Sequence, residues 1–146
     1  MELLLLRLSA SYTAIPDHVH TIEDALPTWA KTPMTGIGLA EALGNAIVHG
    51  ILQLTPRCEE TNLMAWLDEL LARDAGEAGE HDLLVIVHVE DHRATVVIND
   101  GGPGFDWHAA ERRPHRGLGI MSASFDSVAW NEEGNVVALS VQGRVA

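Results

Sequence analysis

Residues 96–106, with the sequence VVINDGGPGFD, contain an apolar β-strand that runs directly into an acidic residue and then into glycines. A strand that ends this way presents its last carboxylate, that of Asp100, at an edge of the sheet. The glycines that follow can adopt positive φ angles and let the backbone lie close to a ligand. We therefore expect a binding pocket where this strand ends.

The β-branched segments around this stretch predict two β-hairpins. Residues 83–90 and 93–99 are separated by a tight Asp91-His92 turn, and residues 127–131 and 136–141 are separated by Glu132-Glu133-Gly134-Asn135. A further strand is expected over residues 3–9. Hairpins require antiparallel pairing, which excludes a doubly wound parallel sheet. We predict an α+β fold, a two-layer α/β sandwich with a mixed, mostly antiparallel sheet and helices on one face, and a single domain over residues 1–146.

Apolar residues at helical spacing predict helices over residues 16–25, about 35–52, 59–75 and about 118–125. Pro16 suits a first helical position, and Thr35 is the expected N-cap of the second helix. His18 and His20 lie two residues apart on the first helix, so they point away from each other and are expected in solvent. The third helix is expected to turn four leucines inward: Leu63, Leu67, Leu70 and Leu71.

The second helix carries a polar stripe formed by Glu41, Asn45 and His49. Residues at i, i+4 and i+8 lie along one face of an α-helix. A solvated polar face would explain the stripe, but the neighbouring residues are small or apolar and contain no Lys or Arg. An exposed helix normally carries charges of both signs. We therefore favour a functional role for this stripe.

The composition excludes several classes of function. The chain has 146 residues, 47% of them apolar, and 21 Asp and Glu against 9 Lys and Arg give a formal net charge of −12. Direct binding to nucleic acid or to anionic membranes depends on basic patches, so neither is expected. The single cysteine, Cys58, cannot form an internal disulfide, and the apolar run near the start is shorter than the ~20 residues of a membrane span. We expect a soluble, cytoplasmic protein.

Three common glycine motifs do not account for the pocket. The phosphate-binding pattern G-x-x-x-x-G-K-[ST] does not occur in the sequence. The residues around Asp100 lack the alternating acidic ligands of a calcium loop. A dinucleotide fingerprint needs a parallel βαβ unit, which the predicted hairpins exclude.

Three motifs taken together carry a more specific signal. Residues 41–50 match E-x-x-x-N-A-x-x-H-G, residues 100–104 match D-x-G-x-G, and residues 116–120 match R-G-x-G-[IL]. In this order they resemble the N, G1 and G2 boxes of the GHKL superfamily of ATP-binding proteins, whose histidine-kinase-like domain has the Bergerat fold. Within it, the chain is most similar to the anti-sigma-factor serine-protein kinases. The resemblance extends over about residues 39–141 and includes the closing pattern D-x-V-x-x-N-x-x-G-N of residues 126–135.

The resemblance implies a site for ATP and Mg²⁺. Asn45 would hold Mg²⁺ through its side-chain oxygen, and Glu41 would be the catalytic acidic residue that acts as general base or orients the nucleophile. Asp100 would accept a hydrogen bond from the exocyclic amine of adenine, whereas guanine presents a carbonyl there. Gly102 and Gly104 would allow close approach of the backbone and hinge a lid.

The G2 box supplies the other implied contacts with the nucleotide. Gly117 and Gly119 would offer backbone N–H groups to the phosphates at a helix start, and Leu118 lies between them in the same cofactor-binding segment. Arg116 is the candidate charge partner of the phosphates. For His49 the expectation is packing, or support of a residue that contacts the ligand, rather than direct catalysis.

The implied function is that of an ATP-dependent serine/threonine kinase. Its substrate would be a small anti-sigma-factor antagonist of the STAS type, and a sigma factor would be a further partner. The resemblance also favours a homodimer. Two departures from the family are the long segment 53–80, which contains an extra helix, and the short lid between residues 105 and 116.

Two alternatives remain at this stage. The first is a nucleotide-gated protein-binding module without kinase turnover, in which ATP and ADP change the affinity for a partner. The second is the catalytic ATPase domain of a two-component histidine kinase, although the chain lacks an H-[ED]-x-x-[TN]-P acceptor motif. If the glycines were simple turns and the polar stripe a solvated face, there would be no site.

Overall fold

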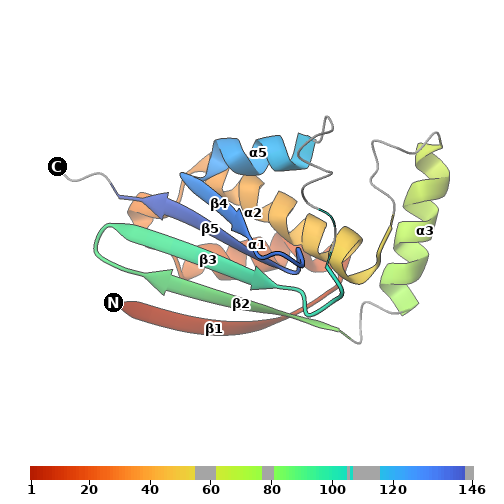
Figure 1. The fold of residues 1–146 in the computed structure, drawn as a ribbon, viewed down its shortest axis with the longest axis horizontal. Coiled ribbons are helices and arrows are strands. Elements are labelled where there is room, and N and C mark those ends of the chain that lie inside the picture. The colour runs from red at the N-terminus through yellow and green to blue at the C-terminus, as the bar shows by residue number, and fades with distance from the viewer. Residues whose placement is uncertain (55–61, 77–80, 105, 107–115, 144–146) are drawn as a thin grey trace.

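The described residues of the computed structural model form one α+β unit (Figure 1). They comprise residues 1–54, 62–76, 81–104, 106 and 116–143. Five strands pair in the order β1-β2-β3-β5-β4, and every described pairing is antiparallel. The predicted α+β class is therefore confirmed, but no parallel pair of the expected mixed sheet occurs among the described strands. The strands are β1 (Glu2–Ser9), β2 (Asp82–Val89), β3 (Arg93–Asn99), β4 (Ser127–Trp130) and β5 (Val136–Gln142).

Helices α1, α2 and α5 lie over one face of the sheet, and α3 stands at the end of the molecule toward which β3 runs (Figure 1). The helices are α1 (Ile15–Asp24), α2 (Pro33–Asn45), α3 (Leu63–Gly76) and α5 (Arg116–Ser124), with a π-helical segment η3 (Ala46–Ile51) directly after α2. Two 3₁₀ turns, η1 (Tyr12–Ala14) and η2 (Thr28–Ala30), flank α1. None of the described helices has the length and apolar character needed to cross a lipid bilayer.

The core lies between the sheet and these helices. Alternate residues of the strands face inward, so that Val85, Val87, Val96, Ile98 and Leu139 are at most 2% exposed. They pack against Ile22, Leu39, Leu43 and Ile47 of the helices, all fully buried. Burial of such side chains contributes roughly 25 cal/mol per Å² of apolar surface and is the main term that holds the two layers together.

The opposite face of the sheet is apolar near its β1 edge. Leu3 and Leu5 on β1 are 72% and 66% exposed, and Leu84 on β2 is 37% exposed. Leu3 lies opposite His88 and Leu5 opposite Ile86 in the pairing of β1 with β2. β1 has no second partner among the described strands, so it is an edge strand with an uncovered leucine row.

Helix α2 begins earlier than predicted. Its N-cap is Thr32, whose hydroxyl accepts the N–H of Thr35 at 3.2 Å, while the Thr35 hydroxyl accepts the N–H of Thr32 at 3.3 Å. Thr35 is thus the third helical residue of a capping box rather than the cap, since Pro33 takes the first helical position, where its missing N–H costs nothing.

Helix α3 turns only part of the predicted face inward: Leu70 is buried and Leu67 packs against the core, as predicted, but Leu63 and Leu71 do not. Leu70 and Trp66 are buried, whereas Leu63 and Leu71 are 49% and 52% exposed. The helix is oriented by Asp74, which accepts the Ser11 hydroxyl at 3.1 Å and the backbone N–H of Tyr12. Because this contact comes from a distant part of the chain, the periodicity of the leucines alone could not reveal it. The first residues of the predicted helix, Cys58 and linker residues 77–80 lie outside the described residues.

The predicted exposure of His18 is wrong. Its side chain is buried on the inner face of α1, and Nε2 lies 2.8 Å from the carbonyl oxygen of Ser9 and 3.2 Å from its hydroxyl. His18 therefore ties α1 to the end of β1. His20, on the other side of the helix, is exposed as expected.

Candidate functional site

Asp100 lies at the end of β3, where the carboxylate is buried with 6% exposure. Its Oδ1 accepts the backbone N–H of Gly102 at 2.7 Å, and the preceding Asn99 accepts the N–H of Gly101 at 2.8 Å. Burial raises the pKa of Asp100 from 3.8 to about 6, although the hydrogen bond from Gly102 lowers it in part. An ionised carboxylate has about four acceptor positions, so Asp100 keeps capacity for a ligand that donates.

The backbone of Gly50 lies directly against this carboxylate. A Cβ at Gly50 would lie 2.2 Å from Oδ2 of Asp100, and a Cβ at Gly102 would lie 2.4 Å from the carbonyl oxygen of Gly50. Neither position has room for a side chain. Gly50 lies in the π-helical segment Ala46–Ile51, and such segments are frequent at functional sites.

The turn between β4 and β5 supports the glycine loop from its other side. The backbone N–H of Asp100 donates to the carbonyl of Asn135 at 3.0 Å, and the Asn135 side chain donates to the carbonyl of Gly102 at 3.0 Å. Gly104 has a φ of +84°, and a Cβ there would lie 1.8 Å from the carbonyl oxygen of Glu133. The glycine at 104 is therefore required by both its backbone conformation and its contact. Asp100, Gly102 and Gly104 form one rigidly supported loop with Gly50.

Asn45 is buried between α2 and α5. It is 5% exposed, and its Nδ2 donates to the sulfur of Met121 at 3.3 Å. This contact leaves Oδ1 as the atom that a hard cation would use. The two helices approach closely because Gly38 of α2 lies against Ser124, the last residue of α5, and against Phe125, which follows it.

Glu41, Asn45 and His49 have different surroundings in the structure. Glu41 is half-buried on α2, and Nδ1 of His49 donates to the carbonyl of Leu54 at 3.0 Å. The α-helix ends at Asn45, and a π-helical turn holds more residues than an α-helical one. The expected stripe therefore continues from the α-helix into the π-helical segment at His49. The contact with Leu54 agrees with the packing role expected for His49.

Arg116, Gly117, Leu118 and Gly119, the residues predicted as a G2 box, form the first turn of α5. Among the described residues, no atom outside the surrounding helical backbone lies within 4 Å of a Cβ built at Gly119, and the same holds at Gly44 of α2, one residue before Asn45. The side chains of Arg116 and Leu118 and most of the predicted lid lie outside the described residues.

The donor set fits a nucleotide with a bound Mg²⁺ only if the phosphates share in holding the ion. Among residues with described placement, no group of three or more His, Cys, Asp or Glu could hold a metal. Mg²⁺ commonly takes one or two protein oxygens and completes its shell with phosphates and waters. The single amide oxygen of Asn45 is compatible with that arrangement, and the buried carboxylate of Asp100 is compatible with a donating base.

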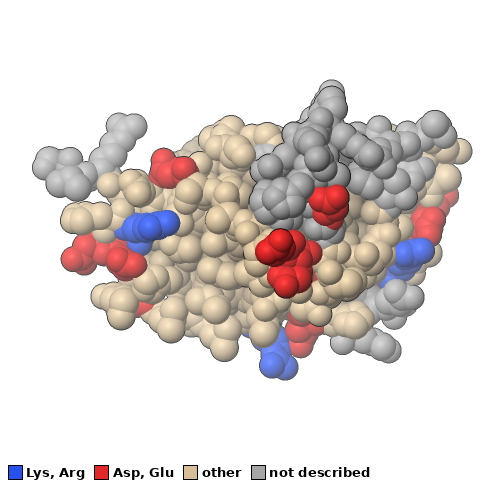
Figure 2. All heavy atoms as spheres, viewed as in Figure 1, with Lys and Arg blue, Asp and Glu red and all other residues tan. Residues whose placement is uncertain are grey.

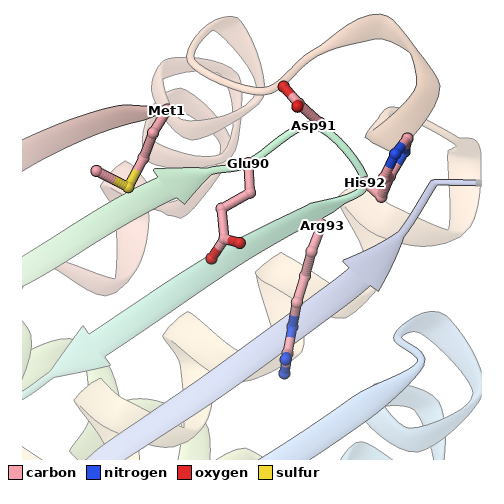
Figure 3. A pocket seen from close by; sticks show the side chains of 5 residues that line it. All are labelled: Met1, Glu90, Asp91, His92 and Arg93. Atoms are coloured by element: carbon pink, nitrogen blue, oxygen red, sulfur yellow. The ribbon is translucent and has the colours of Figure 1, made fainter.

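Two open hollows lie elsewhere on the surface. One, of about 370 Å³, is lined by Met1, Glu90, Asp91, His92 and Arg93 at the β2–β3 turn, at the opposite end of β3 from Asp100 (Figure 3). Two of its charged side chains have structural partners: Glu90 lies 3.5 Å from Nδ1 of His88, and Arg93 donates to the Ser140 hydroxyl at 3.2 Å. The other, of about 430 Å³, lies between β1, β2 and the end of α1. Neither hollow contains a predicted site residue.

The surface in view carries isolated basic groups between acidic ones (Figure 2). The described ion pairs with Arg are exposed, at 3.8 Å between Arg7 and Asp82 and 2.9 Å between Arg73 and Glu69. Exposed pairs of this kind contribute little to stability.

Sequence reasoning missed two residues of the site. Asn135 appeared in the sequence as a turn residue and as the last position of the closing pattern, without an assigned role, and Gln53 appeared only as a loop residue. Their roles come from hydrogen bonds to Gly102 and Gly104, which are distant in sequence. The motifs did contain Gly50, but its contact with Asp100 becomes clear only in three dimensions.

The chain matches no known family model and no curated protein.

Proposed function

We propose that this protein is an ATP-binding regulatory protein with the Bergerat fold of the GHKL superfamily. The observation that carries the proposal is the buried Asp100 carboxylate, which the backbones of Gly50 and Gly102 enclose on two sides. A carboxylate held this way favours a base that donates, as adenine does, over one that presents a carbonyl. The order of the three sequence motifs supports the same conclusion.

In this proposal each residue has a defined task. Asp100 accepts the exocyclic amine of adenine, and Oδ1 of Asn45 contributes to the Mg²⁺ site. The first turn of α5, with Gly117, Leu118, Gly119 and Arg116, receives the phosphates through backbone N–H groups and positive charge. Bound Mg-ATP supplies the transferable phosphoryl group. Glu41 orients the attacking hydroxyl or accepts its proton.

The test of the site is a calorimetric titration of Mg-ATP and Mg-GTP into the wild type and Asp100→Asn. We expect binding of ATP and not GTP, and at least tenfold weaker ATP binding in the variant. The asparagine amide can accept the N–H of Gly102 but meets adenine with a neutral group, so folding is retained while recognition weakens. Equal binding of the two nucleotides, or no effect of the substitution, would contradict the proposed site.

We further propose that the protein is a cytoplasmic serine/threonine kinase for a small STAS-type anti-sigma-factor antagonist, with a sigma factor as a second partner. Incubation with such an antagonist and Mg-ATP should give acid-stable phosphoserine or phosphothreonine. Glu41→Gln should abolish the transfer and leave ATP binding within about threefold, because Glu41 acts on the nucleophile rather than on the nucleotide.

The two alternatives give different results in the same experiment. A nucleotide-gated binding module would transfer no phosphate but would bind the partner with different affinities in ATP and ADP. The catalytic domain of a histidine kinase would give acid-labile phosphohistidine on a supplied dimerisation domain. Either result would replace the serine/threonine kinase proposal.

The exposed leucine row of β1 supports a homodimer. Glu2 and Arg7 lie near opposite ends of β1, so antiparallel pairing of two β1 strands brings the acidic end of each toward the basic end of the other. Leu5→Lys should shift the sedimentation profile from dimer to monomer with little change in the unfolding midpoint, because Leu5 is 66% exposed in the single chain. A wild type that is monomeric at all concentrations would exclude the dimer.

A further inference from the structure

Gln53 occupies an unfavourable backbone conformation directly after the π-helical segment. Its φ is 55°, the only positive value among the described non-glycine residues. This left-handed region is disfavoured for residues with a Cβ, and glycine adopts it freely. Glycine would suit this backbone conformation better, so the presence of glutamine points to a role of its side chain.

The side-chain amide of Gln53 contacts three backbone carbonyls. Nε2 lies 2.5 Å from the oxygen of His49, 2.9 Å from that of Gly50 and 3.1 Å from that of Gly104. Carbonyl oxygens only accept, so this orientation of the amide, with its NH₂ group toward them, is the one that avoids repulsion. The two hydrogens of the NH₂ group are shared among the three acceptors.

These contacts join the two backbone segments that enclose Asp100. Gly50 lies against the Asp100 carboxylate at the end of the π-helical segment, and Gly104 closes the glycine loop that begins at Asp100. Gly104 is 51 residues from Gln53 in sequence. Asn135 supports the same loop from the β4–β5 turn, on the other side. Gln53 is thus a side-chain bridge between the N-box segment and the G1 loop.

We propose that Gln53 is a positioning residue, which sets the separation of Gly50 and Gly104 and thereby the orientation of the Asp100 carboxylate toward adenine. This inference rests on the proposed nucleotide site. Gln53 itself need not touch the nucleotide, since its donors are used by the three carbonyls. Its loss should weaken base discrimination more than it weakens the fold.

Two variants distinguish the effect of the Gln53 side-chain amide from the effect of its backbone conformation. Gln53→Gly removes the amide and relieves the left-handed conformation, so the unfolding midpoint should stay the same or rise. Gln53→Glu keeps the size of the side chain and replaces the NH₂ group with an oxygen that faces carbonyls. Gln142→Glu makes the same chemical change at an exposed position at the end of β5 and is the matched control.

The readouts are the dissociation constants for Mg-ATP and Mg-GTP, and hydrogen exchange of the amides of residues 101–104 in the nucleotide-free protein. We expect both Gln53 variants to bind ATP at least tenfold more weakly, with a smaller ratio between ATP and GTP. Exchange at residues 101–104 should accelerate at least fivefold, with core amides of β3 unchanged. Gln142→Glu should match the wild type in all three measurements.

Wild-type binding constants and exchange rates in both Gln53 variants would overturn the inference and leave the nucleotide site intact. A general loss of stability, with faster exchange throughout and an unchanged ATP/GTP ratio, would also overturn it, since Gln53 would then be structural only. If the wild type binds neither nucleotide, the proposed function fails together with this role. The exchange measurement would then show separately whether the bridge itself exists.

Discussion

At the scale of single residues, recognition of adenine and burial have opposite effects on the ionisation of Asp100. Recognition of adenine needs an ionised acceptor, yet the carboxylate is 6% exposed and burial raises its pKa to about 6. The N–H of Gly102 compensates only in part. The folded state therefore holds the Asp100 proton more tightly than the unfolded chain does.

This pKa predicts that Asp100→Asn stabilises the protein at neutral pH. The stabilising contribution of a protonated Asp100 is complete below about pH 3.8 and is lost as the pH rises through about 6. At pH 7.5 the free energy of unfolding of the variant should exceed that of the wild type by about 1–3 kcal/mol, since each pKa unit corresponds to about 1.4 kcal/mol. Urea unfolding at pH 7.5 and pH 4 checks this, and the difference should shrink at the lower pH. A variant less stable than the wild type at pH 7.5 would contradict it.

The same titration should appear in nucleotide binding. ATP affinity of the wild type should fall by about tenfold between pH 7.5 and pH 5, as Asp100 takes up a proton with a pKa of about 6. The nucleotide phosphates also titrate, so Asp100→Asn serves as the reference. The effect of Asp100 is the difference in the pH dependence of ATP affinity between the wild type and Asp100→Asn. Parallel profiles of the two proteins would show that Asp100 does not contribute to this dependence.

At the scale of elements, the crossing of α2 and α5 depends on one glycine. A Cβ at Gly38 would lie 2.5 Å from Cβ of Ser124 and 2.6 Å from the Phe125 ring, whereas a Cβ at Gly36 would meet only the Glu23 carboxylate at 3.5 Å. Both glycines lie in the same helix, so they form a matched pair.

Gly38→Ala should lower the free energy of unfolding by about 1–3 kcal/mol, because it forces the two helices apart. Gly36→Ala should raise it by about 0.5–1 kcal/mol, because alanine restricts the unfolded chain and favours the helix. Thermal unfolding of the two variants gives the comparison. Since Asn45 and Met121 meet across the same crossing, Gly38→Ala should also weaken Mg-ATP binding. Equal effects of the two substitutions would argue against close packing at Gly38.

Prediction from sequence succeeded where the signal was local. Alternation of β-branched residues located both hairpins. Asp100, Gly102 and Gly104, which lie within five residues of each other, do form one loop. Prediction from sequence failed where a contact with a distant part of the chain determined the local structure. Asp74 sets the buried face of α3 through Ser11 and Tyr12, and the change from α- to π-helix after Asn45 accompanies packing against Asp100.

At the scale of the whole molecule, the excess of acidic residues gives a net charge of −12 and a self-repelling surface. Added salt screens this repulsion over distances of about 10 Å at 0.1 M. We therefore expect the unfolding midpoint to rise by about 2–4 °C, equivalent to about 1 kcal/mol, between low salt and 0.5 M NaCl. Scanning calorimetry in the two buffers measures it. A fall in the midpoint would mean that attractive ion pairs outweigh the repulsion.

The position of β1 in the sheet also matters during protein synthesis. Leu3 pairs opposite His88, so β1 leaves the ribosome well before its partner strand has been made. At ordinary translation rates of 5–20 residues per second, the delay is roughly 4–17 s. Through this interval the leucines of β1 have no strand to pair with, and the sheet cannot close. Leu3 and Leu5, which stay exposed in the finished chain, are thus also among the apolar residues that a nascent chain presents longest to chaperones.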